Sequence, residues 1–247
     1  MARRRLDDLL VARGLAPDRD AAARLVMAGL VLSGSRRLEK PGETVRDDLA
    51  IDVRRPEHPF VSRGGVKLAA ALDAFVLDCV GVVALDVGAS TGGFTDCLLQ
   101  RGATRVYAVD SGSNQLAWKL RGDPRVVSLE RVSIRAATTA QIPEPVAAIV
   151  CDVSFAPLRE VLPAALTFAA PGAWLVVLVK PQFEAARHEV GDGGIVRDPH
   201  IHERTVAAVS DWVGARPCWR VLGTMQSPIE GAEGNREFLL AARHGAG

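Results

Sequence analysis

The pattern of hydrophobic and polar positions changes at about residue 82 of the chain. Before this point, short apolar stripes and isolated apolar pairs predict small helices and short strands. After it, continuous apolar runs alternate with patterns of helical spacing. Strands that are apolar on both faces are typical of a parallel sheet with helices on both sides. We therefore predict an α/β protein, with a Rossmann-like sheet preceded by a small α+β domain.

The larger region predicts a doubly wound sheet. We expect strands at 82–87, 105–110, 125–129, 147–152, 174–180, 218–225 and 237–242. Helices are expected at 93–100, 113–120, 158–169 and 199–213. In such a sheet, ligands bind at the carboxyl ends of the strands. The residues that follow each strand are therefore the first candidates for a functional site.

The first region predicts two helices and then short strands. One apolar stripe begins at Leu6 and stops at Gly14, and Asp18 is placed to cap a second helix that Gly29 closes. Short strand-like segments follow at 31–32 and 50–53. Two prolines in 56–59 resist both helix and strand. The pattern therefore predicts a domain at 1–54, a linker at 55–61, and a second domain at 62–247 that begins with a helix capped by Ser62.

Composition places the chain among soluble globular proteins. Of its 247 residues, 48% are hydrophobic and 24% are charged, and the net charge is +1. The four cysteines form no CxxC pair, which argues against a zinc site and against a disulfide framework. No apolar run is long enough to span a bilayer, and the basic start lacks the apolar segment of a secretory signal. We expect a cytoplasmic protein that binds no metal and no membrane.

The positive charge gathers in the first region. Residues 1–63 hold thirteen Lys and Arg against ten Asp and Glu, whereas the remainder holds seventeen against nineteen. Two clusters, at 3–5 and at 36–40, contribute much of the excess. A solvated face and a nucleic-acid surface explain these clusters equally well.

A glycine-rich turn after the first strand of the sheet suggests a nucleoside-type cofactor. The segment 85–94 reads LDVGASTGGF, and Asp110 ends the next strand 22 residues after Gly88. An acid at that place suits hydrogen bonds to ribose hydroxyls. Ser90 stands where a dinucleotide fingerprint needs glycine, so a cofactor without phosphates, S-adenosylmethionine, fits better. Asp86 and Glu130 also end strands on this edge; a plain strand-to-helix turn is the alternative.

Two polar residues end the strands that follow. Asp152 ends the strand at 147–152 and Lys180 ends the strand at 174–180, so both should face the same crevice as the cofactor. Taken alone, Lys180 reads as a surface lysine. Beside Asp152 it becomes a candidate acid–base pair that removes a proton from a hydroxyl nucleophile. No proline follows the acid in the segment 152–155, DVSF, which disfavours the motif of amino-methylating enzymes.

These segments together resemble the TlyA family of bacterial rRNA cytidine-2′-O-methyltransferases, whose members are sometimes labelled haemolysins. The resemblance runs along nearly the whole chain, in the segments 5–7, 61–68, 86–96, 152–155, 179–184, 193–197 and 234–238. Two departures are Ser133, where the family usually has asparagine, and Pro157, where it often has serine. Both put details of cofactor contact in doubt but leave the reaction class unchanged.

The resemblance implies an RNA-binding domain like that of ribosomal protein S4, followed by an FtsJ-like methyltransferase domain. FtsJ-like enzymes use Lys, Asp, Lys and Glu in that order, which match Lys67, Asp152, Lys180 and Glu237. The candidate cofactor-binding residues are Asp86, Gly88, Ser90, Thr91, Gly92, Gly93, Phe94, Asp110 and Glu130. The candidate RNA-binding residues are Arg3, Arg4, Arg5, Arg19, Arg36, Arg37, Lys40 and Arg63.

The implied function is methyl transfer from S-adenosylmethionine to cytidine 2′-hydroxyls in ribosomal RNA. Family members act on the large subunit alone or on both subunits, and the short tails of this chain favour the narrower type. Three rival functions stay open. They are a non-catalytic RNA-binding or assembly factor, a cytolysin, and a dehydrogenase, the last disfavoured by Ser90.

Overall fold

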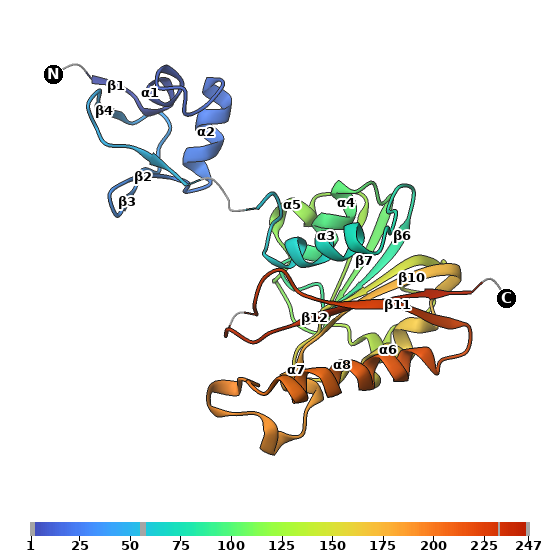
Figure 1. The fold of residues 1–247 in the computed structure, drawn as a ribbon. Coiled ribbons are helices and arrows are strands. Elements are labelled where there is room, and N and C mark those ends of the chain that lie inside the picture. Colours follow the sequence, from blue (N-terminus) through green and yellow to red (C-terminus); the bar gives the residue numbers. More distant parts are fainter. Residues whose placement is uncertain (1–2, 55–57, 232, 246–247) are drawn as a thin grey trace. The chain divides into compact units, whose positions relative to one another are not determined.

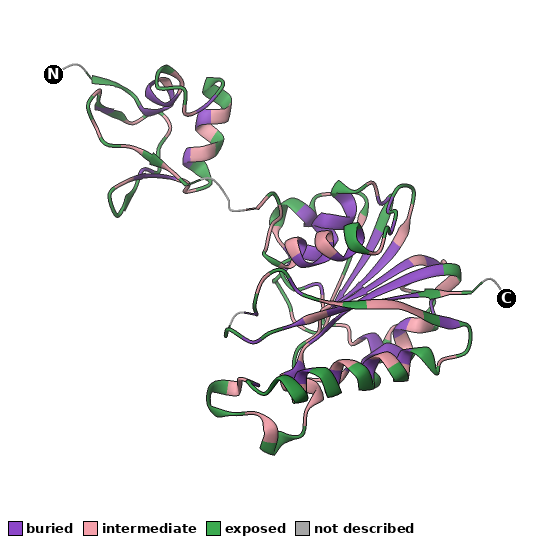
Figure 2. Ribbon diagram, in the orientation of Figure 1, coloured by how far each residue is buried: buried purple, intermediate pink, exposed green. Residues whose placement is uncertain are grey.

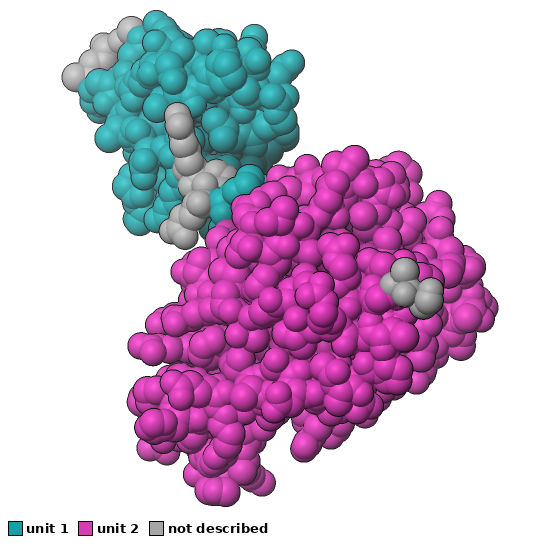
Figure 3. Space-filling view, turned by 45° about the vertical axis from the view of Figure 1, so that its right-hand side comes forward, with its two compact units in different colours: residues 1–59 teal, residues 60–247 magenta. Residues whose placement is uncertain are grey.

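The chain forms two compact units in the computed structural model, which describes residues 3–54, 58–231 and 233–245. The units comprise residues 1–59 and 60–247, coloured separately in Figure 3. The boundary between them falls within the segment 55–61 that we expect to be a linker. Of that segment, residues 55–57 lie outside the described residues.

The first unit packs two helices against short strands (Figure 1). Its elements are β1 (Arg3–Arg5), α1 (Leu6–Ala12), α2 (Arg19–Met27), β2 (Val31–Ser33), β3 (Arg36–Arg37), β4 (Thr44–Arg46) and β5 (Asp52–Val53). Asp18 caps α2 as the sequence predicts, because its side chain accepts a hydrogen bond from the Ala21 N–H at 2.7 Å. The small core includes Leu6 and Leu10 of α1 and Val26 of α2.

Strands β1 and β4 are absent from the sequence prediction. They pair antiparallel with Arg3 opposite Arg46, and β3 pairs with β2 in a separate three-stranded sheet ordered β3-β2-β5. A strand made of three arginines carries no apolar signal. Its partner lies about forty residues away in the sequence, so local pattern is unable to reveal the pairing.

The second unit alternates strands and helices. Its main elements are α3 (Gly64–Ala74), β6 (Val83–Val87), α4 (Gly93–Gln100), β7 (Arg105–Asp110), α5 (Trp118–Arg121), β8 (Val126–Glu130), β9 (Val146–Cys151), α6 (Leu158–Leu166), β10 (Ala169–Val179), α7 (Pro181–Glu184), α8 (Pro199–Gly214), β11 (Trp219–Gln226) and β12 (Phe238–His244). Short 3-10 turns lie at η1 (Ile134–Ala136), η2 (Arg187–Glu189) and η3 (Asp192–Gly194).

The seven strands form one sheet in the order β11-β12-β10-β9-β6-β7-β8. The predicted parallel arrangement holds for β8, β7, β6, β9 and β10, but β12 runs antiparallel to both β10 and β11. No helix lies between β11 and β12 in the described part of that connection. A chain that returns without a crossover helix pairs antiparallel, so the Rossmann-like sheet is parallel except at this edge.

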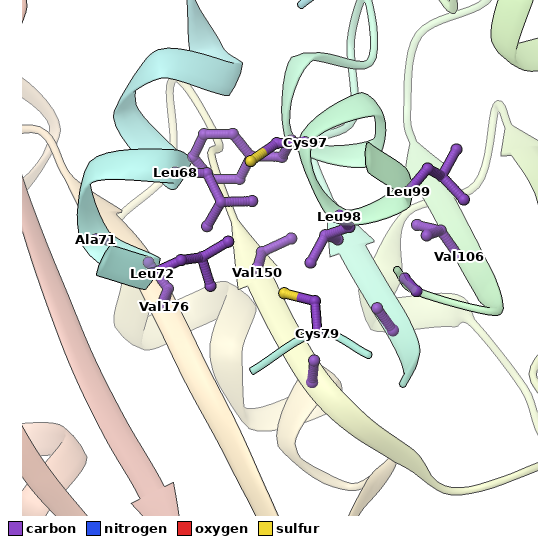
Figure 4. Packing of buried hydrophobic residues seen from close by; sticks show 14 of the residues in the cluster. Leu68, Ala71, Leu72, Cys79, Cys97, Leu98, Leu99, Val106, Val150 and Val176 are labelled. Atoms are coloured by element: carbon purple, nitrogen blue, oxygen red, sulfur yellow. The ribbon is translucent and has the colours of Figure 1, made fainter. Parts of the chain in front are cut away.

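Helices cover both faces of the sheet, so most residues of its central strands are buried (Figure 2). On one face, Leu68, Leu72 and Leu98 of α3 and α4 pack on Val150 and Val176, as Figure 4 shows for part of this cluster. On the other face, α6 and α8 pack on the side chains that alternate with these. This arrangement explains the continuous apolar runs in the sequence.

Two local predictions in this unit are wrong. The helix expected at 113–120 shrinks to α5, because Asn114 adopts a left-handed backbone (φ 58°) and the Glu130 carboxylate accepts hydrogen bonds from the N–H groups of residues 114–116. Ser62 does not cap α3. The N-cap residue is Arg63, and no side chain makes the capping bond there.

Candidate active site

Two adjoining cavities lie at the carboxyl ends of the parallel strands. The larger, of about 680 Å³, is lined by residues that include Gly88, Asp110 and Ser133. The smaller, of about 260 Å³, is lined by Ser62, Arg63, Gly64, Lys67, Gly88, Ala89, Ser90, Gly93, Phe94, Asp152, Lys180 and Glu237. Both cavities share Gly88, Ser90 and Asp152. A ligand in the larger cavity therefore lies next to the lysines of the smaller one.

The glycine-rich turn brings its backbone close to the end of β9. Gly88 has a φ of 80°, and a Cβ there would lie 2.5 Å from the carbonyl oxygen of Asp152. A larger residue would push these two strand ends apart, so glycine is required at this position. The turn itself lines both cavities.

Asp110 faces the larger cavity, whereas Glu130 does not line it. The Asp110 carboxylate accepts hydrogen bonds from the N–H groups of Ser90 at 2.8 Å and Gly112 at 2.7 Å. Glu130 is occupied with the turn at 114–116 and forms an ion pair with Arg121 at 2.7 Å. The backbone N–H groups, followed by Arg121, lower the pKa of Glu130. Glu130 thus stabilises the turn beside the cavity.

Asp86 is fully buried behind the turn. Its Oδ2 accepts a hydrogen bond from the Thr95 hydroxyl at 2.6 Å, and Oδ1 has no hydrogen-bond partner among the described residues. Burial, assisted by the neighbouring charge of Asp152, raises the pKa of Asp86 to about 7. Among the other predicted cofactor residues, Thr91 and Gly92 line neither cavity; Thr91 accepts a backbone hydrogen bond from Ala117 and Gly92 begins α4.

The four residues matched to the catalytic pattern come together in the smaller cavity as two ion pairs. Lys180 Nζ lies 2.7 Å from Asp152 Oδ1. Lys67 of α3 pairs with Glu237, which directly precedes β12, and both side chains are buried. Lysine charge inside a cavity is costly unless it is paired or used. Two lysine–carboxylate pairs facing one space provide both a proton acceptor and the charges that orient it.

Sequence reasoning assigned no role to Ser154, although the segment 152–155 was singled out. Its hydroxyl accepts a hydrogen bond from Lys180 Nζ at 2.9 Å. The position of Ser154 was a usable signal. It follows Asp152 by two residues in the loop at the strand end, so its hydroxyl can reach Lys180, the partner of Asp152. Asn235 was likewise passed over: it is buried, accepts from the Val196 N–H at 3.0 Å and donates to the Gly194 carbonyl at 2.9 Å.

The basic residues of the first unit divide into two kinds. A cavity of about 690 Å³ within this unit is lined by Arg36, Arg37, Glu39, Lys40, Gly42 and Glu43. By contrast, Arg5 and Arg19 lie 2.7 Å and 3.2 Å from the buried carboxylate of Asp7. Arg3 donates to the Thr44 carbonyl and Arg4 pairs with Asp47. Arg63 lies in the second unit, at the smaller catalytic cavity.

Neither a metal centre nor a membrane span emerges from the part of the chain that the structure describes. No cluster of three or more His, Cys, Asp or Glu side chains is arranged there to hold a metal ion. No described helix is long and apolar enough to cross a bilayer.

The strand order, the glycine turn and an acid at the end of β7 define an S-adenosylmethionine-dependent methyltransferase. Residues 60–244 match the FtsJ-like methyltransferase family and residues 4–51 match the S4 domain. The O-methyltransferase of Bacillus cereus, solved with S-adenosylhomocysteine, has the same fold: it is 17% identical, with a TM-score of 0.51 over 76% of this chain and 84% of its own.

Closer relatives match nearly the whole chain. The 16S/23S rRNA (cytidine-2′-O)-methyltransferase TlyA of Mycobacterium tuberculosis is 46% identical over 98% of this chain and 91% of its own length. Hemolysin A of Brachyspira hyodysenteriae is 37% identical over 95% of this chain and 98% of its own length. A solved structure of a hemolysin-named protein from Streptococcus thermophilus is 42% identical. Its TM-score is 0.73 over 99% of this chain and 90% of its own. This chain belongs to the TlyA family of FtsJ-like methyltransferases.

Proposed function

We propose that this chain transfers a methyl group from S-adenosylmethionine to the 2′-hydroxyl of cytidine in ribosomal RNA. The observation that carries the proposal is the pair of lysine–carboxylate contacts that face one cavity beside the cofactor turn. A ribose hydroxyl is a weak nucleophile that needs a proton acceptor. Relatives of 46% identity bear the name rRNA (cytidine-2′-O)-methyltransferase, which supports the same acceptor here.

The residues of the larger cavity fit the cofactor. Asp110 offers a carboxylate for ribose hydroxyls, and the Gly88 turn offers a close backbone approach that a Cβ would fill. Ser90 in place of glycine suits a ligand without phosphates. S-adenosylmethionine, when bound, supplies an electrophilic methyl group. The cavity volume of about 680 Å³ is within the range of small-molecule sites.

Each residue of the smaller cavity has a distinct task in this proposal. Lys180, once its ammonium has released a proton to solvent, would accept the proton of the ribose 2′-hydroxyl at Nζ while that hydroxyl oxygen attacks the methyl group that the cofactor supplies. Asp152 orients Lys180 and balances its charge. The buried pair of Lys67 and Glu237 shapes the opposite wall of the cavity. Most of the rate would come from holding the hydroxyl in line with the methyl group.

The proposed domain organisation assigns RNA binding to residues 1–54, linkage to 55–61 and catalysis to 62–247. Small basic domains bind RNA through phosphates and 2′-hydroxyls more than through base edges. The basic cavity of the first unit supports this assignment, and Arg63 would meet the RNA at the catalytic cavity. An rRNA substrate and four cysteines without a disulfide accord with a cytoplasmic protein.

The test is methylation with isotope-labelled S-adenosylmethionine. Small subunits, large subunits and whole ribosomes from a strain without this modification serve as acceptors, and digestion identifies the labelled nucleoside. We expect label in 2′-O-methylcytidine, at least in the large subunit; the small subunit shows whether the substrate range is broad. Label on a base would refute the role of Lys180. Cofactor binding with no label on any acceptor would favour a non-catalytic RNA-binding factor.

A further inference from the structure

The Lys180 ammonium has one hydrogen-bond acceptor within the described residues, and that acceptor is Ser154. The contact between Lys180 Nζ and Asp152 Oδ1 is close, at 2.7 Å, but its angles fall outside those of a hydrogen bond. Asp152 therefore holds the Lys180 side chain in place by charge, and Ser154 adds the directional hydrogen bond that fixes its rotation. An amine that rotates about its last carbon–nitrogen bond needs such a directional partner to aim its lone pair.

Two contacts link the loop that carries Ser154 to the loop after β10. Phe155, the next residue, is 91% exposed and has a left-handed φ of 67°, which is costly for a bulky side chain. The Phe155 ring packs on Phe183 of α7 at 5.2 Å between centroids. In addition, Glu184 accepts a hydrogen bond from the Leu158 N–H at 2.7 Å. The loops after β9 and β10 are thus joined at two further points, both just beyond the Ser154–Lys180 contact.

Ser154 also lies where the two cavities meet. It lines the larger cavity, Lys180 lines the smaller, and Asp152 lines both. The hydroxyl is exposed, so it contributes little to the core, and its hydrogen bond to Lys180 is the one contact of its side chain that the structure records.

We propose that Ser154 is a positioning residue for methyl transfer, whose hydroxyl fixes the rotation of Lys180 Nζ so that its lone pair faces the ribose 2′-hydroxyl. This inference rests on the proposed function. With one N–H directed to Ser154 and the Asp152 carboxylate close by, the remaining tetrahedral position of the nitrogen is left for the substrate. Loss of the Ser154 hydroxyl would leave the ion pair of Lys180 with Asp152 intact, but the Lys180 amino group would then rotate freely about its carbon–nitrogen bond.

The test compares Ser154→Ala with Ser154→Thr, which keeps the hydroxyl, and with Ser128→Ala, an exposed serine on β8, as the matched control. For Ser154→Ala we expect kcat to fall about tenfold, the worth of one hydrogen bond to a charged group, with KM for the ribosomal substrate and cofactor affinity unchanged. Ser154→Thr should restore most of the rate, and Ser128→Ala should match the wild-type chain.

A second readout does not depend on turnover. Nuclear magnetic resonance of isotope-labelled lysine side chains reports how freely the Lys180 amino group moves. Loss of the Ser154 hydroxyl should increase that motion in Ser154→Ala, whereas Ser154→Thr should match the wild-type chain.

The outcomes separate the two proposals. If the wild-type chain methylates no ribosomal substrate, the proposed function fails. If the wild-type chain is active and Ser154→Ala keeps the full rate and the same motion of the Lys180 amino group, only the role of Ser154 is overturned. An equal loss in Ser154→Ala and Ser154→Thr would likewise reject the hydroxyl as the source of the effect.

Discussion

One buried aspartate in each unit shows how differently the two regions treat charge. Asp7 in the first unit and Asp86 in the second are both almost inaccessible to solvent. Hydrogen bonds from Arg5, assisted by Arg19, hold the pKa of Asp7 at about 2. Asp86 has a hydroxyl partner and no cation in contact, and burial raises its pKa to about 7. The first unit neutralises its buried carboxylate with arginines from the surface.

The second unit treats its buried aspartates unequally. Asp96 pairs with Lys119 at 3.1 Å, whereas Asp86 has no ion pair among the described residues. Lys67 and Lys180 pair with Glu237 and Asp152 in the smaller cavity. On the proposed function, the difference teaches that charge in the first unit is divided between folding and RNA binding, whereas Lys67 and Lys180 of the second unit serve methyl transfer. Four predictions test this distinction, in order of decreasing effect.

The largest effect is expected for Lys180→Ala. If Lys180 is the proton acceptor, methyl transfer should fall by about a thousandfold or more, with cofactor affinity close to that of the wild-type chain. Calorimetric titration and the labelled-methyl assay measure the two quantities. Lys119→Ala is the matched control, since Lys119 pairs with Asp96 outside both cavities. A variant that retains its activity would remove Lys180 from the mechanism.

The buried pair of Lys67 and Glu237 should show a stability effect. Lys67→Met leaves the Glu237 carboxylate buried without its partner, which should cost about 3–5 kcal/mol in the free energy of unfolding. The double variant Lys67→Met/Glu237→Gln should recover most of that loss and stay inactive. Denaturant unfolding followed by tryptophan fluorescence reports this unit, because all four tryptophans lie in it. Equal stability of the single and double variants would contradict a buried charge pair.

The two aspartates should respond to pH in opposite directions. Because the folded pKa of Asp86 is raised, its contribution to stability is complete below about pH 4 and is lost as pH rises towards 7, by about 2–4 kcal/mol. Asp86→Asn should remove that loss between about pH 4 and pH 7 in the same fluorescence assay.

For Asp7 the sign is reversed. Its folded pKa is depressed, so its contribution of about 1–2 kcal/mol is present above pH 4 and is lost as pH falls towards 2. Hydrogen exchange of the α1 amides in the full chain measures it, and Asp7→Asn is the control that should lack this acid transition. The same sign of pH dependence for both aspartates would break the comparison.

The smallest effect concerns the basic residues that line the cavity of the first unit. Arg37→Ala and Lys40→Ala should each weaken RNA binding about fivefold. Each should also reduce the slope of log affinity against log salt concentration by about one, because one phosphate contact is lost. Stability should be unchanged, because neither side chain has an ion pair among the described residues. Arg5→Ala should lose stability as well, through Asp7. Arg105→Ala, exposed on β7 and paired with Glu144, is the control; RNA binding that is insensitive to salt would refute the assignment.

The sequence predicted most of the second unit because its signals are local. The helix at Gly93–Gln100 and the strand at Arg105–Asp110 have the predicted bounds. Continuous apolar runs reflect burial on both faces, and the strand-end rule placed Asp152 and Lys180 side by side from residue type alone. The choice of Lys67 and Glu237 came from family resemblance, since neither residue carries a local signal, and the structure showed that the two form a pair.

The sequence by itself determined the α/β class, the cofactor turn, the family and the candidates for proton transfer, because periodicity and short motifs encode them. The tertiary structure alone decided the antiparallel β12, the pairing of β1 with β4, and the hydrogen bond from Lys180 to Ser154. It also decided which arginines hold Asp7 and which line an open cavity. The physical reason is that partners distant in sequence are chosen by packing and desolvation, which depend on the whole fold and leave no trace in local pattern.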